Sequence, residues 1–483
     1  MEFYAESSNI SDNQLLLPNG NVITFNEMQY EGILKIKKWL GDYNNQFFTL
    51  AGYAGTGKST IVKKILDKYK LRHNVVVSAP THKAKKVVSN TTGINGLTLQ
   101  SLLGLRPDIN LDDFNPNDPQ FNQIAIPKID EYDLVVIDEA SMINSDLYEL
   151  IKNTVANINT KILFIGDPAQ IPPVNEKESI IFYDNTIQTH WLTKIERQTN
   201  TNPLSLIYDN LRNNLDKING GFVRKTVMNE LGEGVVFTKN KKEFRNIVID
   251  KFNSLEFKRD SDFCKVIAWR NETVNSSNKI IRNELFGKNS DIIEIGDILM
   301  GYRNVSHESQ WYNIIENSAD YVVVKKSKLE ENEYGIKGFN VQLRENLSSD
   351  QYQYTDVFIV DINDYDNLHQ YAEMHDFFRD IGKSNKKLWS KYYKFRRDNL
   401  IMTTINKYRD GSYRESYNVI VKDLDYGFAI TAHKSQGSTY SHVFIMENDI
   451  NLNRQLKERN QIKYVAFTRP RMSAIVLTDV NDN

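Results

Sequence analysis

The segment that decides the fold spans residues 46–66 and reads QFFTLAGYAGTGKSTIVKKIL. Its middle, from Gly52 to Ser59, has the Gly-x-x-x-x-Gly-Lys-Ser pattern of a phosphate-binding loop, placed between a strand-like and a helical run. Glycines let the backbone N–H groups face phosphate oxygens, Lys58 neutralises the outer phosphates, and the Ser59 hydroxyl suits Mg²⁺. The pattern predicts ATP binding through Gly55, Thr56, Gly57, Lys58, Ser59 and Thr60.

A second apolar run, residues 132–137, ends in Asp138 and Glu139. A continuous apolar run of this length predicts a buried parallel strand. At its carboxyl end, Asp138 can hold Mg²⁺ through water, and Glu139 can orient the water that attacks the γ-phosphate. The two segments together predict an ATPase site.

Composition limits the class of protein. The chain has 483 residues, a formal net charge of -2 and one cysteine, Cys264. This length suggests about three domains, and one cysteine excludes a disulfide within the chain and a cysteine-based zinc site. No apolar run approaches the roughly 20 residues of a membrane span, and residues 1–6 lack a secretory pattern, so we expect a cytoplasmic protein. The near-neutral charge argues against a protein that coats nucleic acid, so a polyanion would need a local basic groove.

Strand-like runs recur at 46–51, 75–79, 133–138 and 161–166, and a helix is expected from about Asn26 to Leu40. The alternation predicts an α/β fold with a doubly wound parallel sheet that binds ligands at its strand ends. A segment rich in Asp, Asn and Pro, residues 104–128, interrupts it. A second alternating region begins near Gly234 and resumes with strands at 426–430, 442–445 and 474–477.

These boundaries predict five parts. They are an extension at 1–24, a first domain at 25–198 with an insertion at about 104–128, a second domain at 199–290 and 420–483, and an insertion at 291–419 with strands and a helical stretch.

Six blocks in this order resemble superfamily 1 helicases, most closely the 5′-to-3′ branch that contains RecD and Dda. They are residues 51–60, 79–86, 136–142, 166–174, 431–438 and 464–469. The resemblance implies two RecA-like P-loop domains, each with an insertion: a small pin domain in the first, and an SH3-like β domain with a helical tower in the second. It also implies ATP and Mg²⁺ as cofactors.

The resemblance assigns further residues to ATP. Gln170 would sense the γ-phosphate, and Arg197 and Arg469 would stabilise charge on the transferred phosphoryl group, which suits the planar donors of arginine. Gln29 matches the glutamine that contacts adenine, although ordinary surface exposure remains an alternative. Gln436 in the fifth block would also contact the nucleotide.

The residues that the resemblance assigns to DNA have side chains suited to sequence-independent phosphate contacts. They are Thr81, His82, Thr98, Ser101, Asn271, His433 and Lys434. Thr98 could equally be a helix cap. Phe121 in the first insertion matches the pin aromatic that stacks on a base, with a core or loop phenylalanine as the alternative.

We therefore expect an ATP-dependent DNA helicase that moves 5′ to 3′ on single-stranded DNA, acts at junctions with duplex and works as a monomer. Replication proteins and single-strand-binding proteins are its candidate protein partners. Two alternatives stay open. One is a superfamily 1 RNA helicase, because backbone contacts do not identify the sugar. The other is an ATP-driven translocase that remodels protein–nucleic acid complexes without unwinding.

Overall fold

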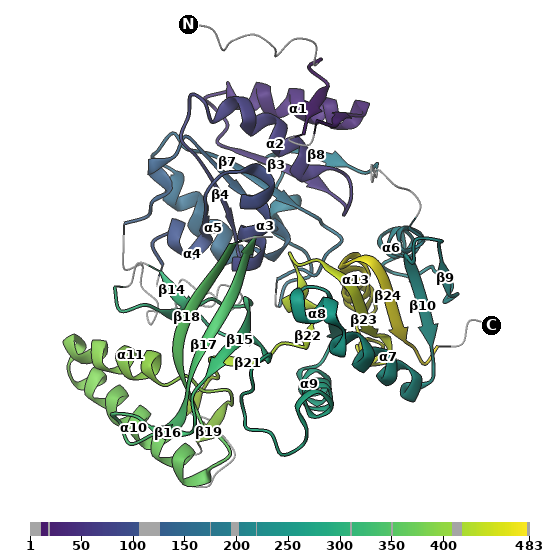
Figure 1. The fold of residues 1–483 in the computed structure, drawn as a ribbon. Coiled ribbons are helices and arrows are strands. Elements are labelled where there is room, and N and C mark those ends of the chain that lie inside the picture. The colour runs from purple at the N-terminus through teal and green to yellow at the C-terminus, as the bar shows by residue number, and fades with distance from the viewer. Residues whose placement is uncertain are drawn as a thin grey trace, which may run out of the picture. The chain divides into compact units, whose positions relative to one another are not determined.

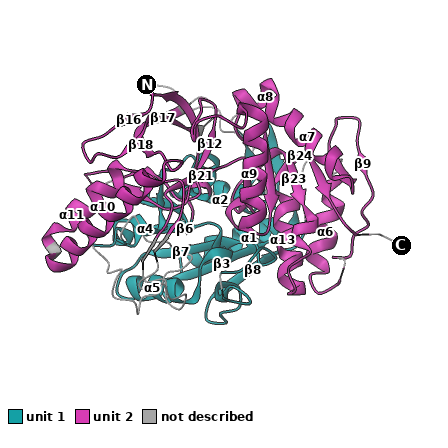
Figure 2. Ribbon diagram, turned by 90° about the horizontal axis from the view of Figure 1, so that it is seen from below, with its two compact units in different colours: residues 1–80, 84–105, 111–200 teal, residues 81–83, 106–110, 201–483 magenta. Residues whose placement is uncertain are grey.

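The computed structural model describes residues 11–17, 20–105, 126–173, 175–194, 202–218, 220–309, 312–348, 351–407 and 418–480. The chain forms two compact units (Figures 1 and 2). The first contains residues 1–80, 84–105 and 111–200, and the second contains residues 81–83, 106–110 and 201–483. None of the described helices is long and apolar enough to cross a membrane.

The first unit is built around one sheet with strand order β5-β4-β6-β7-β3-β8, in which every pairing is parallel. Its strands are β1 (Gln14–Leu16), β2 (Val22–Thr24), β3 (Phe47–Gly52), β4 (Val75–Ala79), β5 (Gly96–Thr98), β6 (Leu134–Ile137), β7 (Lys161–Gly166) and β8 (Gln188–Leu192). Its helices are α1 (Glu27–Leu40), α2 (Lys58–Tyr69), α3 (His82–Thr92, whose first two residues are grouped with the second unit), α4 (Leu99–Leu102) and α5 (Ser145–Val155). The doubly wound sheet expected from the sequence is confirmed.

The order of strands brings the sequence motifs to one edge. Strand β3 lies beside β7, and β7 lies beside β6. Because the strands are parallel, the segments that follow β3, β7 and β6 all leave the same edge of the sheet. A core that includes Trp39, Phe48, Ile61 and Leu66 packs α1 and α2 against the sheet and so holds the start of α2 in place.

The second unit contains two larger sheets. Its strands are β9 (Val227–Met228), β10 (Gly234–Thr238), β11 (Cys264–Ala268), β12 (Ile298–Gly301), β13 (Val305–Ser306), β14 (Asn313–Ile315), β15 (Asp320–Lys326), β16 (Glu330–Glu331), β17 (Lys337–Ser348), β18 (Gln351–Val360), β19 (Ile405–Lys407), β20 (Asn418–Ile420), β21 (Leu424–Tyr426), β22 (Ala429–Thr431), β23 (Tyr440–Met446) and β24 (Pro470–Leu477). Its helices are α6 (Leu204–Asn213), α7 (Lys241–Asn253), α8 (Leu255–Arg259), α9 (Asn271–Phe286), α10 (Tyr365–Ser384), α11 (Trp389–Asp398), α12 (Glu447–Ile450) and α13 (Leu456–Thr468).

The first of these sheets has the order β22-β11-β23-β24-β10-β9 and is parallel except for the pairing of β9 with β10; we call it the parallel sheet. The second has the order β16-β17-β15-β12-β21, with β18 paired to β17, and all its pairings are antiparallel; we call it the antiparallel sheet. Helices α10 and α11 lie together at one end of this unit (Figures 1 and 2).

The strand predicted at residues 426–430 is wrong as a single element. Tyr426 ends β21, which pairs with β12 of the antiparallel sheet, whereas Ala429 begins β22, which pairs with β11 of the parallel sheet. The sequence is apolar throughout because both sheets are buried here. Gly427 separates the two strands, and a Cβ atom at this position would lie 3.2 Å from Cγ2 of Ile298.

Candidate functional site

The loop between β3 and α2 has the backbone that a phosphate-binding loop requires. Gly55 and Gly57 have φ of 82° and 85°, a left-handed conformation that glycine adopts without strain. Gly57 caps α2 without a side-chain hydrogen bond, which leaves the N–H groups of the first helical turn to an anion. The Lys58 ammonium donates to the carbonyls of Gly52 (2.6 Å) and Tyr53 (3.0 Å), so its charge is held at the mouth of the loop.

Gln29 reaches this loop from α1. Asn26 and Gln29 form a capping box, because Asn26 accepts from the Gln29 N–H and the Gln29 side chain accepts from the Asn26 N–H. The same side chain donates through Nε2 to the carbonyl oxygen of Thr56 at 2.9 Å and is 4% exposed. The surface-exposed alternative for Gln29 is therefore excluded, whereas its predicted contact with adenine stays a prediction.

Asp138 and Glu139 follow β6 at the same edge of the sheet. Burial raises the pKa of Asp138, whereas the backbone N–H of Glu139 and the nearby charge of Lys58 lower it. That N–H donates to Oδ1 of Asp138 at 2.9 Å. Glu139 has φ of 54°, which is unusual for a residue other than glycine and costs about 1–3 kcal/mol. The turn thus holds two adjacent acidic residues at the end of β6.

Gln170 follows β7, the strand between β3 and β6. Asp167 shapes the turn, because its Oδ1 accepts from the Ala169 N–H and its carbonyl accepts from the Gln170 N–H. Gln170 is 6% exposed. The order of strands therefore places Gln170 between the segments that carry Lys58 and Asp138.

The donor set fits Mg²⁺. Ser59 supplies a hydroxyl oxygen and Asp138 a carboxylate oxygen, which are the hard ligands that Mg²⁺ prefers, usually with water and substrate phosphates. Ser59 is the second residue of α2, which follows β3, and Asp138 follows β6, so both lie at the same edge of the sheet.

In the second unit, Arg469 is the C-cap residue that follows α13, and it is 6% exposed. Its guanidinium donates to the carbonyls of Val465 (3.0 Å) and Ser438 (3.0 Å) and to Oγ1 of Thr468 (2.9 Å). Gln436, also buried, lies in the loop that ends at Ser438. Arg469 therefore connects the sequence block at residues 464–469 to the block at residues 431–438.

His433 and Lys434 begin that loop. Lys434 donates to Oδ1 of Asn317 at 3.2 Å, and its ammonium lies 4.2 Å from the centre of the Tyr302 ring. Burial lowers the pKa of His433, although Glu458 opposes this shift. A neutral imidazole can donate a hydrogen bond to a phosphate without contributing charge.

Asn271 is the exposed first residue of α9. The backbone before it is anchored by Asp449, whose carboxylate accepts from the N–H groups of Trp269 (2.8 Å) and Arg270 (2.9 Å). Arg270 also donates from Nε at 2.7 Å to Asp449. Asp449 therefore holds Trp269 and Arg270 in place directly before Asn271.

The remaining predicted DNA residues have mixed surroundings. Thr98 caps α4 by accepting from the Ser101 N–H at 3.3 Å, so the helix-cap alternative is confirmed for its hydroxyl. Thr81 and Ser101 are partly exposed. His82, which belongs to the second unit, contacts Glu345 at 2.9 Å and Glu316 at 3.4 Å. Burial alone would lower the pKa of His82, but these two hydrogen bonds outweigh it and raise the pKa.

Two predicted residues, Arg197 and Phe121, lie outside the described residues, as does most of the insertion at 104–128. Reasoning from the sequence did not find Asp449, Asn317 or Tyr302. Each lies more than 100 residues along the chain from the residue it holds, so no local pattern could have indicated it.

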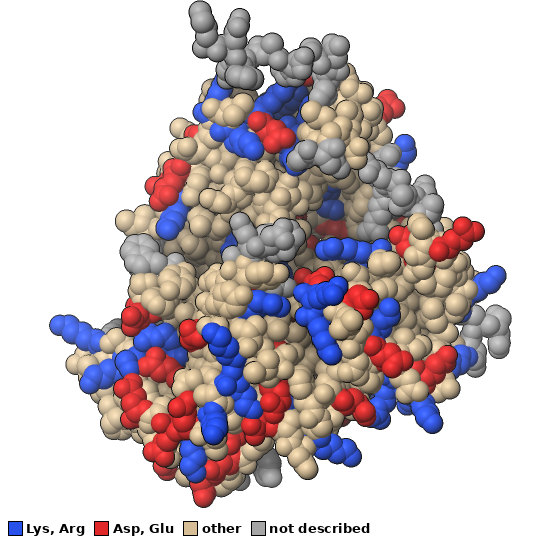
Figure 3. Space-filling view, in the orientation of Figure 1, with Lys and Arg blue, Asp and Glu red and all other residues tan. Residues whose placement is uncertain are grey.

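The charge of the visible surface agrees with localised contacts. On the face in Figure 3, positive and negative side chains intermingle, and acidic side chains gather toward the lower left of the view. Together with the net charge of -2, this argues against a broad positive surface on this face.

Comparison with known proteins agrees with this geometry. Residues 36–218 match an AAA domain family, and residues 426–477 match the UvrD-like helicase C-terminal domain. The ATP-dependent DNA helicase Dda of enterobacteria phage T4 is 25% identical over 453 residues, which cover 88% of this chain and 92% of Dda. An uncharacterised protein of Acanthamoeba polyphaga mimivirus is 26% identical over 92% of this chain and 98% of its own length.

A solved structure shares the fold. The crystal structure of Pif1 helicase from Bacteroides, in complex with ADP-AlF3 and single-stranded DNA, has a TM-score of 0.52 and 17% identity, covering 93% of this chain and 92% of that chain. The sequence blocks, their placement at the strand ends and the matched domains agree. These findings support a superfamily 1 helicase of the RecD/Pif1/Dda type.

Proposed function

We propose that this chain is an ATP- and Mg²⁺-dependent DNA helicase that moves 5′ to 3′ along single-stranded DNA as a monomer and separates duplex ahead of it. The observation that carries the proposal is the set of side chains at one edge of the first sheet. Lys58, Gln170 and the pair Asp138–Glu139 follow three adjacent strands, β3, β7 and β6, and so leave the same edge of the sheet.

The chemistry divides among these residues. Bound Mg·ATP supplies the phosphoryl group that is transferred to water. Lys58 and the N–H groups of the first turn of α2 bind the phosphates, and Ser59 and Asp138 hold the ion. Glu139 accepts a hydrogen bond from the attacking water and orients it. Gln170 contacts the γ-phosphate, and Arg469 and Arg197 stabilise the charge that develops on it.

The DNA contacts are proposed for side chains on both units. Thr98 and Ser101 lie in the first unit, and Thr81, His82, Asn271, His433 and Lys434 lie in the second. Both sets suit phosphates, so binding would be independent of sequence. Alternating the grip of the two sets during each cycle of hydrolysis would move the protein along one strand. Phe121 would stack on a base at the junction with duplex.

The choice of DNA and the polarity are supported by the resemblance to the 5′-to-3′ branch. The long alignment with a protein named as an ATP-dependent DNA helicase supports the same assignment. The distinguishing experiment uses two matched partial duplexes, one with a 5′ tail and one with a 3′ tail, incubated with ATP and Mg²⁺. We expect unwinding from the 5′ tail alone.

Two variants control this experiment. Lys58→Ala should abolish both hydrolysis and unwinding, whereas Lys68→Ala, an exposed lysine of the same helix, should match the parent protein. Unwinding from the 3′ tail alone would overturn the polarity. ATPase activity without unwinding of either duplex would favour the remodelling translocase, and stronger stimulation by single-stranded RNA would favour the RNA helicase.

A further inference from the structure

The parallel and antiparallel sheets of the second unit are joined by two segments of chain. Residues 287–297 lead from α9 to β12 of the antiparallel sheet, and Gly427 with Phe428 leads back from β21 to β22 of the parallel sheet. Two short connections of this kind can act as a hinge in other proteins. Here the contacts of α9 determine whether the two sheets can turn against each other.

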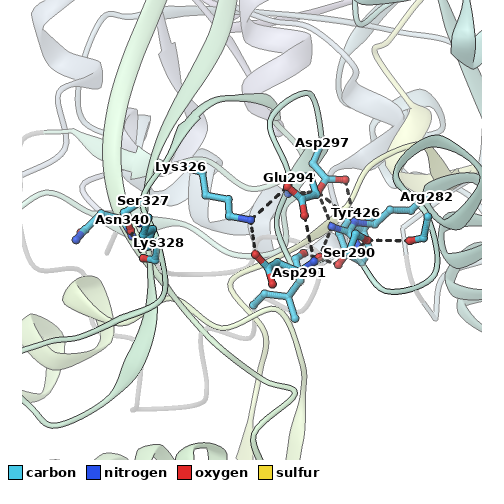
Figure 4. A network of polar contacts seen from close by, with 12 residues as sticks. Arg282, Ser290, Asp291, Glu294, Asp297, Lys326, Ser327, Lys328, Asn340 and Tyr426 are labelled. Atoms are coloured by element: carbon cyan, nitrogen blue, oxygen red, sulfur yellow. Dashed lines mark hydrogen bonds and ion pairs between the residues drawn. The ribbon is translucent and has the colours of Figure 1, made fainter.

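Arg282 of α9 holds the first connection, as Figure 4 shows. Its guanidinium donates to both carboxylate oxygens of Asp297 at 3.0–3.1 Å and to Oγ of Ser290 at 3.0 Å. It also donates to the carbonyl of Asp291. Arg282 is 7% exposed and Asp297 is fully buried, so the pair is shielded from water and salt.

The same guanidinium holds the second connection. It lies 4.8 Å from the centre of the Tyr426 ring, and the Tyr426 hydroxyl donates to the carbonyl of Ile292 at 2.6 Å. One turn earlier in α9, Asn278 donates to the carbonyls of Tyr426 (2.8 Å) and Ala429 (3.1 Å) and accepts from the Ala429 N–H (2.7 Å). One helix therefore fixes both connections.

A second ion pair closes the network from the antiparallel sheet. Lys326, the last residue of β15, contacts Asp291 at 2.6 Å and Glu294 at 3.2 Å, and the Glu294 N–H donates to Asp297 at 2.7 Å. In Figure 4 the Lys326 side chain points away from Ser327 and Lys328 toward this connection. The network thus runs from α9 through residues 291–297 to β15.

Apolar packing between the two sheets reinforces this polar network. Ile298 of β12 belongs to the core beneath the parallel sheet, and Val322 of β15 and Tyr426 of β21 pack against that core. The two sheets consequently share apolar side chains at the junction. Turning one sheet against the other would expose this surface and break a buried bidentate ion pair, both of which are unfavourable.

We propose that Arg282 is a positioning residue that makes the two sheets of the second unit move as one body. This inference rests on the proposed helicase function. Each ATP-driven movement of the parallel sheet would then carry the antiparallel sheet, α10 and α11 with it. Because β22 leads into His433 and Lys434, α9 also sets the position of the proposed DNA contacts relative to the antiparallel sheet. Loosening the junction would leave ATP hydrolysis intact but would reduce the number of base pairs opened per ATP.

The direct test measures the distance between the sheets. Exposed Lys279 of α9 and exposed Lys328, which follows β15, are replaced by cysteine and labelled with a donor and an acceptor dye. The native Cys264 is buried, so it does not compete for the dyes. We expect one narrow distance distribution with single-stranded DNA, with or without a non-hydrolysable ATP analogue. A distance that changes with the analogue would overturn the proposal.

The functional test uses Arg282→Met, which keeps the apolar stem and removes the donors. We expect ATP hydrolysis stimulated by single-stranded DNA to stay within about twofold, while unwinding of a 5′-tailed duplex falls about tenfold. The loss should be larger on a GC-rich than on an AT-rich duplex, because a loose junction transmits less force. Uniform loss of hydrolysis and unwinding on both duplexes would show a merely structural role and overturn the proposal.

A matched control is Arg245→Met. Arg245 of α7 also pairs with an α9 residue, Glu284, but its side chain is 52% exposed, so this variant should behave like the parent. If Arg282→Met does not fold, the variant Lys326→Met is measured in its place. A smaller number of base pairs opened per ATP than in the parent would support the proposal. An unchanged number would overturn it. The dye experiment stays informative even if the parent protein unwinds neither duplex, in which case only the proposed function fails.

Discussion

The side-chain amide of Gln29 donates a hydrogen bond of 2.9 Å to the carbonyl oxygen of Thr56, inside the phosphate-binding loop. The same nitrogen lies where a Cβ atom at Gly57 would approach to 2.5 Å. The first helix therefore supports the loop before any nucleotide contact is considered. Gln29, which is predicted to contact adenine, therefore also supports the conformation of the loop. Steady-state values of KM and kcat test how much the loop depends on it.

We expect Gln29→Ala to raise the KM for ATP about fivefold, because one hydrogen bond to the loop, about 1 kcal/mol, is lost. The value of kcat should change less, since Lys58 and Glu139 are untouched. Steady-state ATPase measurements in the presence of single-stranded DNA test this. Gln353→Ala, at an exposed position of β18, is the control. An unchanged KM would show that the loop holds its shape without Gln29.

Glu139→Gln should separate ATP binding from hydrolysis. The amide keeps the size of the side chain and removes the carboxylate that orients water, so kcat should fall by about 10²–10⁴. Nucleotide affinity should be nearly unchanged, as measured with a fluorescent ATP analogue. Glu149→Gln, at a side chain that is 56% exposed on α5, should keep full activity. A kcat within threefold of the parent would exclude Glu139 from catalysis.

Lys434 and Lys422 offer a matched pair for DNA binding. Both ammonium groups lie over the Tyr302 ring, at 4.2 and 4.0 Å, but Lys422 also pairs with Asp425. We expect Lys434→Ala to weaken binding of single-stranded DNA and to reduce the salt slope of log K by about 0.7. Lys422→Ala should leave the slope unchanged. Equal slopes for the parent and both variants would remove Lys434 from the DNA contacts.

Glu447 anchors α12 to α13 in the second unit. Its buried carboxylate pairs with Arg224 at 2.7 Å and with Lys463 at 2.9 Å. Glu447→Gln would leave two buried cations without their counter-charge and should reduce the free energy of unfolding by about 3–5 kcal/mol. Urea unfolding measures this change. Glu272→Gln, at a side chain that is 85% exposed, should change stability by less than about 0.5 kcal/mol.

The sign of the pH dependence at Glu447 follows from its pKa. Burial raises the pKa, but Lys463 and Arg224 outweigh burial and lower it below 4.5. A carboxylate with a lowered pKa contributes stability that is present above its unfolded pKa and is lost as pH falls through the folded value. Below pH 4.5 the difference in stability between the parent and Glu447→Gln should therefore shrink. A difference that grows there would contradict the assignment.

Asp297 should show the opposite sign. Burial raises the pKa of Asp297 to about 6, although Arg282 and the N–H of Glu294 lower it. A carboxylate whose pKa is raised by folding destabilises the folded chain while it is ionised, and this cost is relieved as pH falls through about 6. We therefore expect the free energy of unfolding of the parent to rise relative to that of Asp297→Asn as pH falls from 7 to 5. Urea unfolding at both pH values measures this difference. A difference that falls over this range would contradict the assignment.

Local patterns in the sequence determined the chemistry of the first unit. The Gly-rich loop, the strand before Asp138 and the helix from Asn26 are each encoded within about 20 residues, because backbone conformation and hydrophobic period depend on near neighbours. Hence the ATP-site residues and the parallel strands could be predicted. The sequence pointed to Gln29 as a nucleotide contact, but it could not predict the hydrogen bond from Gln29 to the carbonyl oxygen of Thr56.

Only the tertiary structure decided which distant residues meet. Tyr426 and Ala429 lie three residues apart in one apolar run, yet they pair with different sheets, because each strand takes the partner that completes its core. In the same way, Arg282 meets Tyr426 and Asp449 holds Arg270 across more than 140 residues of sequence. Contacts of this kind depend on the packing of whole sheets and helices, which no short segment of sequence specifies.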